Sequence, residues 1–147
     1  QLIKTAFEDN ASAFWNGLGY EKREMYTTQM WANYMRGKGF INDHFHSNSL
    51  VSGVYYLYIE EGSGNTGFGD PMNGSQRMIS VPVEKHTEYT MEKFFVNAVS
   101  DRLVLFPSYL NHWSEPNQEN SARITISFNC LPTELGEEKT LNYVKIN

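Results

Sequence analysis

The amino-acid sequence predicts an all-β fold, a sandwich or barrel, preceded by a short N-terminal helix. From Thr27 onward, short runs rich in β-branched and aromatic residues follow one another, and turn residues such as glycine and asparagine separate them. Almost no helical pattern lies between these runs, which argues against alternating helices and parallel strands. The chain has 147 residues, and we expect residues 1–147 to form one domain.

The expected elements follow in order along the chain. LIKTAFEDNASAFWNGLG predicts a helix that stops near Gly17 or Gly19. Strands are expected in TTQMWANYM, LVSGVYYLYI, RLVLF and RITISFNC. The glycine-rich segment EEGSGNTGFGD indicates a mobile loop that could cover a cavity, while KHTEYTMEKFF fits either a helical turn or an edge strand.

Two of these strands show a period of two, which places alternate side chains on opposite faces. In RITISF the alternation separates apolar from polar side chains: Ile124, Ile126 and Phe128 against Arg123, Thr125 and Ser127. In SGVYYLYI it separates two further sets: Val54, Tyr56 and Tyr58 against Tyr55, Leu57 and Ile59. The polar face of RITISF is unusual for a simple sandwich and suits the lining of a polar cavity.

Composition restricts the class of protein. The formal net charge of −5 argues against a nucleic-acid backbone as the main partner. No apolar stretch is long enough to cross a bilayer, and the first residues lack the pattern of a secretion signal. Cys130 is the only cysteine, so an intrachain disulfide is impossible and a reducing, cytoplasmic compartment is expected. We expect Cys130 to be a small buried residue.

Three of the four histidines indicate a metal site. His44 and His46 are two residues apart, so in an extended segment both imidazoles point to the same side. Imidazole is a good ligand for Fe(II), Zn, Cu or Ni. An isolated H-x-H pair is more often without a metal, but His112 follows the apolar run LVLFP and offers a third ligand. His86 has polar neighbours and is expected at the surface.

Arg123 indicates an anion site in the same cavity. It lies eleven positions after His112 on the polar face of RITISF, and antiparallel neighbouring strands would place the two residues at similar depths. An inward guanidinium is costly unless it meets an anion, and its planar fork suits a carboxylate.

The motifs occur in an order that resembles a known family. Trp31-Ala32-Asn33 is followed by H-x-H, S-G-x-x-Y, F-P-S-x-L-x-H and R-I-x-I-S-F-N, which together span Trp31 to Asn129. This order is similar to that of a small branch of the 2-oxoglutarate- and Fe(II)-dependent oxygenases. The resemblance implies a double-stranded β-helix, or jelly roll, and an enzyme that uses Fe(II), O₂ and the co-substrate 2-oxoglutarate.

The resemblance also implies roles for individual residues. His44 corresponds to the first metal ligand, His112 to the distal histidine, and His46 stands where the wider superfamily has a carboxylate. Asp43 and Asp70 are the other candidates for that ligand. Arg123 corresponds to the residue that pairs with the distal carboxylate of 2-oxoglutarate, with Tyr56 and Ser127 as further contacts.

The reaction implied by this family is the oxidative decarboxylation of 2-oxoglutarate to succinate and CO₂, coupled to oxidation, most simply hydroxylation, of a second substrate. Two other functions stay open. A three-histidine cupin-type dioxygenase would bind its substrate directly, and a jelly-roll binding module would have no catalytic activity. The primary substrate is not indicated by the sequence.

Overall fold

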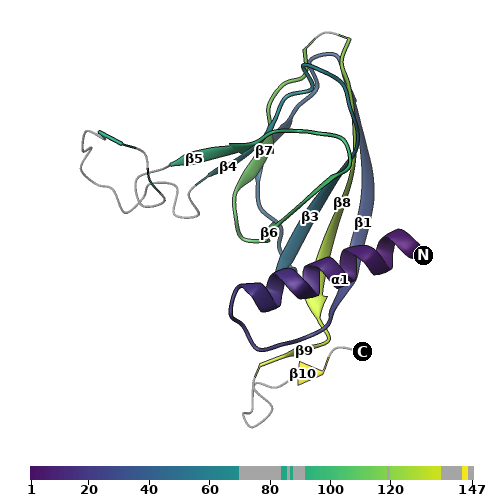
Figure 1. Ribbon diagram of the computed structural model, residues 1–147, viewed down its shortest axis with the longest axis vertical. Helices are drawn as coiled ribbons and strands as arrows, with labels where there is room; N and C mark the ends of the chain where they lie inside the picture. Colours follow the sequence, from purple (N-terminus) through teal and green to yellow (C-terminus); the bar gives the residue numbers. More distant parts are fainter. Residues whose placement is uncertain (70–83, 86, 88–91, 119, 137–143, 146–147) are drawn as a thin grey trace.

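The computed structural model describes residues 1–69, 84–85, 87, 92–118, 120–136 and 144–145. Helix α1 comes first and strands follow it (Figure 1). The elements are α1 (Leu2–Gly17), β1 (Met25–Arg36), β2 (Ile41–His44), β3 (Val51–Ile59), β4 (Thr66–Gly69), β5 (Lys93–Val96), β6 (Arg102–Pro107), β7 (His112–Ser114), β8 (Ala122–Pro132), β9 (Glu134–Leu135) and β10 (Val144–Lys145).

The eight strands β1 to β8 form two antiparallel sheets. One sheet has the order β1-β8-β3-β6 and the other β2-β7-β4-β5, while β9 and β10 pair separately. The chain therefore crosses repeatedly from one sheet to the other, as in a jelly roll. The predicted all-β fold with a short N-terminal helix is confirmed, and four of its strands, β1, β3, β6 and β8, lie where the sequence places them.

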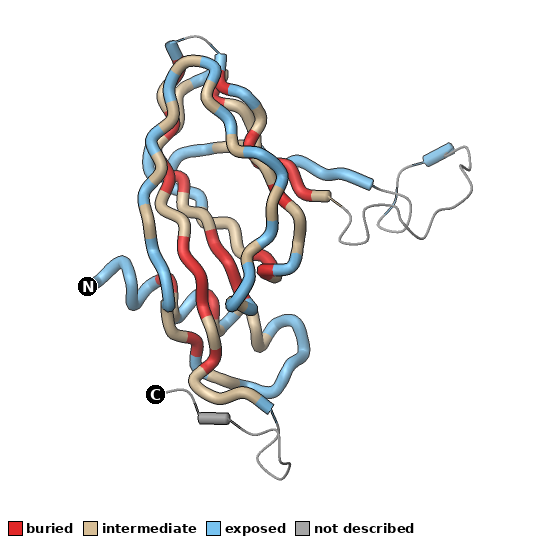
Figure 2. The backbone as a smooth tube through the Cα atoms, turned by 180° about the vertical axis from the view of Figure 1, so that it is seen from behind, coloured by how far each residue is buried: buried red, intermediate tan, exposed pale blue. Residues whose placement is uncertain are grey.

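Helix α1 crosses the outer face of the β1-β8-β3-β6 sheet (Figure 1). The Phe7 ring stacks on the Phe128 ring with a centroid distance of 4.3 Å, and Ala11 is fully buried. The apolar side of β8 thus packs as the alternation predicts, and Figure 2 shows buried positions along the central strands. Burial of one large apolar side chain typically contributes about 1.5–3 kcal/mol, so this contact anchors the helix.

Gly53 permits this packing. A Cβ atom at this position would collide with the Phe128 ring and with Leu105. The absence of a side chain lets the Phe128 ring lie against the β3 backbone.

The alternation along β3 is interrupted by a bulge. Tyr56 pairs with Thr125, but the register shifts and Tyr58 pairs with Ile124. Residues that pair across antiparallel strands face the same side, so Tyr56 points inward and Tyr58 outward. The prediction that both tyrosines share one face is therefore wrong.

Two further predictions need correction. Thr66–Gly69, read from the sequence as part of a loop, forms the buried strand β4. His112 and Arg123 do not lie on neighbouring strands, because β7 pairs with β2 and β4 while β8 pairs with β1 and β3. The segment KHTEYTMEKFF ends in the strand β5, and most of its earlier residues lie outside the described residues.

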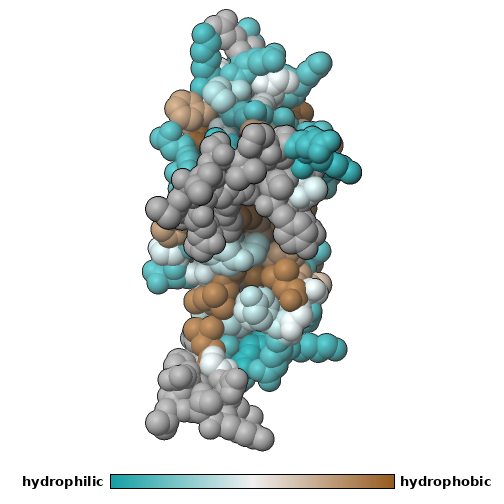
Figure 3. Space-filling view, turned by 90° about the vertical axis from the view of Figure 1, so that its left-hand side faces the viewer, coloured by the Kyte–Doolittle hydropathy of each residue, from teal (hydrophilic) through white to brown (hydrophobic). Residues whose placement is uncertain are grey.

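Aromatic side chains are also exposed, including Tyr34, Phe45 and Tyr109. One face of the molecule shows apolar patches among hydrophilic surface (Figure 3). In the part of the chain that the structure describes, no helix is long and apolar enough to span a membrane.

Candidate metal centre and carboxylate site

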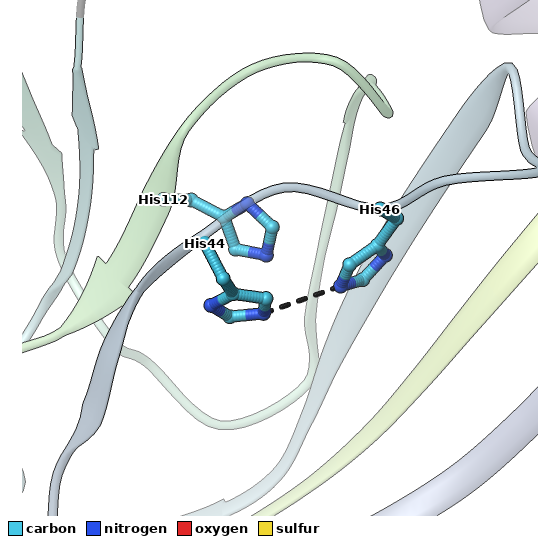
Figure 4. A group of neighbouring side chains, drawn as sticks. All are labelled: His44, His46 and His112. Atoms are coloured by element: carbon cyan, nitrogen blue, oxygen red, sulfur yellow. Dashed lines mark hydrogen bonds between the residues drawn. The ribbon is translucent and has the colours of Figure 1, made fainter.

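The fold brings His44, His46 and His112 together. His44 ends β2 and pairs with His112, the first residue of β7, while His46 lies two residues beyond the strand. The Nε2 atoms of His44 and His46 are 3.3 Å apart, and one ring nitrogen from each of the three residues lies within 4.8 Å of the others (Figure 4). This spacing allows one metal ion to reach all three imidazoles.

The residues next to these histidines in the sequence are not part of the converging group. Phe45 is 62% exposed, as expected if the chain alternates between His44 and His46. Asp43 is exposed and is not among the converging side chains. Asp70 and His86 lie outside the described residues.

The hydrogen bonds fix which nitrogen of each ring carries the proton. His44 Nδ1 lies 2.8 Å from the Asn42 carbonyl oxygen, and His112 Nδ1 lies 3.0 Å from that of Leu110. His46 Nδ1 lies 2.6 Å from Asn129 Oδ1. These oxygens only accept hydrogen bonds, so each Nδ1 donates, and in the neutral ring Nε2 is left with its lone pair.

Three lone pairs that point at one another repel unless a cation lies between them. A proton is a poor candidate, because burial lowers the pKa of His46 and lowers that of His112 to about 4. Mutual repulsion among the three rings acts in the same direction. Nδ1–H groups bound to oxygen acceptors are the usual support for ligating histidines. The residues present therefore fit a divalent metal ion held by three Nε2 atoms.

Arg123 is buried deep in the same fold, with 2% exposure. Its Nη1 donates to the carbonyl oxygen of Gly64 at 2.7 Å, and its Nη2 donates to Thr66 Oγ1 at 2.8 Å. Its Nε is buried without a hydrogen-bond partner among the described residues, and no carboxylate of that part of the chain pairs with the guanidinium. Burial lowers the pKa of Arg123. A buried cation that has no carboxylate partner among the described residues is suited to bind an anion.

Tyr56, which the family resemblance implies as a further contact for the same carboxylate, lies beside Arg123. Its ring centre is 5.2 Å from the Arg123 guanidinium carbon, and its hydroxyl donates to Thr66 Oγ1 at 2.6 Å. Thr66 thus accepts hydrogen bonds from both residues, and its own hydroxyl proton, which has no acceptor among the described residues, can be donated to a ligand.

Ser127 lies between the metal candidates and Arg123. It faces the same side of β8 as Arg123, but it lies four residues further along the strand, which corresponds to a separation of about 13 Å. Its hydroxyl accepts a hydrogen bond from Asn33 Nδ2 at 3.1 Å. Its contact with the distal carboxylate of a ligand stays a prediction.

Sequence reasoning missed two residues of this site. Asn129 continues the polar alternation of β8 by one further step, so extending the pattern beyond Ser127 would have found it. Thr66 gave no comparable signal, because it stands among glycines in a segment that reads as a loop.

Solved structures with a similar fold include two oxygenases of low sequence identity. An oxidoreductase of the 2OG-Fe(II) oxygenase family from Burkholderia pseudomallei has a TM-score of 0.58 and 12% identity, over 81% of this chain and 50% of that one. A prolyl-4-hydroxylase from Pseudomonas putida has a TM-score of 0.55 and 16% identity, over 86% and 64%. The chain thus spans between half and two thirds of these relatives, and their likeness shows the fold.

No curated protein matches this chain. The model of one protein family, described as "Putative 2OG-Fe(II) oxygenase", matches residues 29–129, which include the three converging histidines, Tyr56, Thr66 and Arg123. Since this match extends over more than half of the sequence, the chain belongs to that family of 2OG-Fe(II) oxygenases.

Proposed function

We propose that this protein is an Fe(II)- and 2-oxoglutarate-dependent dioxygenase that hydroxylates a second substrate. One observation carries the proposal: three imidazole nitrogens converge in the same fold as a buried arginine that has no acidic partner among the described residues. The family supplies the identity of the metal and of the co-substrate. The likeness to a prolyl-4-hydroxylase supports hydroxylation as the type of oxidation.

The metal would be held by His44, His46 and His112. Bound Fe(II) supplies the chemistry that couples O₂ and 2-oxoglutarate to substrate oxidation and leaves succinate and CO₂. Each of the three histidines would present the lone pair of its Nε2 to the metal, because its Nδ1–H is already bound to an oxygen.

Arg123, Tyr56 and Thr66 would hold the distal carboxylate of 2-oxoglutarate. Arg123 supplies the positive charge, and Thr66 can donate its remaining hydroxyl proton. Because these groups are buried, their interaction with the carboxylate is weakened little by water. Ser127, halfway along β8, would line the path between this carboxylate and the metal.

The three-histidine dioxygenase is the second candidate, since His46 replaces the carboxylate that the wider superfamily uses. Such an enzyme would bind its own substrate at the metal and would not need 2-oxoglutarate. For either enzyme we also propose that residues 1–147 work as one domain and that the protein is cytoplasmic, in keeping with its single, buried cysteine.

Anaerobic titration of the Fe(II)-loaded protein with 2-oxoglutarate tests the proposal. Saturable appearance of the weak visible charge-transfer band of the chelate is expected. Succinate as a matched dicarboxylate without the keto group should give no band. Iron binding without any band would exclude 2-oxoglutarate as the co-substrate and favour the second candidate, and no iron binding would exclude both enzymes.

A further inference from the structure

His46 is oriented differently from the other two histidines. His44 and His112 each donate from Nδ1 to the carbonyl oxygen of the residue two positions earlier, so the local chain orients them. His46 donates instead to the side chain of Asn129, which is 83 residues away in the sequence and lies on strand β8. The orientation of His46 therefore depends on tertiary structure.

Three adjacent strands hold Asn129 in place. It pairs across the sheet with Gln29 of β1 on one side and with Ser52 of β3 on the other. Asn129 is 4% exposed and Ser52 is fully buried. The side chain of Asn129 is thus fixed at the centre of the sheet, beneath His46.

In the structure, the oxygen end of the Asn129 amide faces His46. Asn129 Nδ2 donates to Gln29 Oε1 at 3.0 Å, and Ser52 donates its hydroxyl proton to Asn129 Oδ1 at 2.8 Å. These contacts agree with the oxygen end reaching His46, at 2.6 Å. Ser52 Oγ also lies 2.9 Å from His46 Nδ1 and can share the same N–H.

We propose that Asn129 is a positioning residue that holds the imidazole of His46 in its Nδ1–H tautomer, so that Nε2 can serve as the metal ligand in place of the usual carboxylate. The inference rests on the proposed metal site. A histidine at this position needs such a partner because either ring nitrogen of a neutral imidazole can carry the proton, and an Nε2–H group cannot bind a metal. Partners of this kind are commonly worth 10- to 100-fold in metal affinity.

The test combines two measurements on the full chain. Nitrogen NMR of the imidazole rings, recorded on metal-free protein near neutral pH, reports the tautomer of His46. Competition with a chromophoric chelator reports the affinity for Zn²⁺, which does not depend on catalysis. The variants are Asn129→Leu, which removes the acceptor at similar volume, and Asn129→Asp, which keeps an acceptor. Asn33→Leu is the matched control, because Asn33 donates to Thr125 and Ser127 on the same strand β8.

In the native protein we expect the Nδ1–H form of His46. Asn129→Leu should increase the Nε2–H form and weaken Zn²⁺ binding by about 10- to 100-fold. Asn129→Asp should keep both the tautomer and at least the native affinity, and Asn33→Leu should change neither.

An unchanged tautomer in Asn129→Leu, an equal loss of affinity in Asn33→Leu, or weakened binding in Asn129→Asp would each overturn the inference. The Asn129→Asp result decides the question even if Asn129→Leu does not fold. Native protein with the expected tautomer but no Zn²⁺ binding would instead contradict the proposed metal site, so the two failures are distinguishable.

Discussion

The guanidinium carbon of Arg123 lies 5.2 Å from the centre of the Tyr56 ring, so this buried cation rests over an aromatic side chain. A cation over an aromatic ring gains roughly 0.5–2 kcal/mol, which partly offsets the cost of burying the charge. The two amino groups of Arg123 donate hydrogen bonds to the carbonyl oxygen of Gly64 and the hydroxyl of Thr66, while its Nε has no partner among the described residues. The arrangement keeps Arg123 charged and available to an anion.

Replacement of Arg123 should therefore affect the co-substrate more than the metal. A charge-assisted hydrogen bond is typically worth about 1.5–3 kcal/mol, so Arg123→Ala should weaken 2-oxoglutarate binding by about tenfold to a hundredfold. Arg123→Lys should recover only part of the loss, because an ammonium group cannot reproduce the planar fork. Calorimetric titration with metal and with 2-oxoglutarate measures both affinities in one variant. Equal loss of both would indicate collapse of strand β8.

The hydroxyl groups of Thr66 and Tyr56 should differ in importance. Tyr56→Phe removes one neutral donor and leaves Thr66 in contact with Arg123, so 2-oxoglutarate affinity should fall by roughly two- to tenfold. Thr66→Val should cost more, because it leaves both the buried Tyr56 hydroxyl and one Arg123 N–H without their acceptor. The same titration measures both variants. A larger loss in Tyr56→Phe than in Thr66→Val would contradict the bridging role of Thr66.

Metal binding should require both His44 and His112. Either change to alanine leaves two imidazoles, which make a poor site, so stoichiometric Fe(II) binding should be lost in each single variant. Metal analysis after anaerobic gel filtration measures the iron content. His86→Ala is the control for loss of a histidine, since the sequence places His86 at the surface. One equivalent of iron in the double variant His44→Ala/His112→Ala would contradict the ligand assignment.

Part of this site could be predicted from the sequence because strand periodicity is a local property. The i, i+2 spacing of His44 and His46 and the alternation that turns Arg123 inward follow from the pleat alone. The third histidine could be added because it comes after an apolar strand, and the structure places it opposite His44.

The remainder depends on pairing between distant segments. Thr66 lies in a strand only because β7 and β5 pair with it on either side, and nothing within GSGNTGFG signals those partners. Tyr58 points outward because β3 has a bulge against β8, where one extra residue interrupts the alternation. Such features are set by sheet register, which the pattern within one segment does not contain.

Cys130 should be unreactive in the folded protein. It is fully buried, and burial raises the pKa of its thiol to about 11, although a contact with Thr27 partly opposes the shift. At pH 8 only roughly one thiol in a thousand would be the reactive thiolate, and reagents would have to reach it through the core beneath α1. Labelling with a chromogenic disulfide should therefore be slow in buffer and stoichiometric in denaturant. Rapid labelling of the folded chain would show that this part of the core opens easily.

The unusual ligand gives the sharpest prediction about the metal centre. His46 stands in the position of a carboxylate, and a carboxylate is the usual third ligand of Fe(II) beside two histidines. His46→Asp should therefore retain iron and allow 2-oxoglutarate turnover at the native rate or above, whereas His46→Ala should lose most of its iron affinity. Iron content and succinate formation, measured side by side, separate binding from turnover. If His46→Ala kept the native affinity, another group would occupy the third position, and Asp43→Ala and Asp70→Ala in that background would identify it.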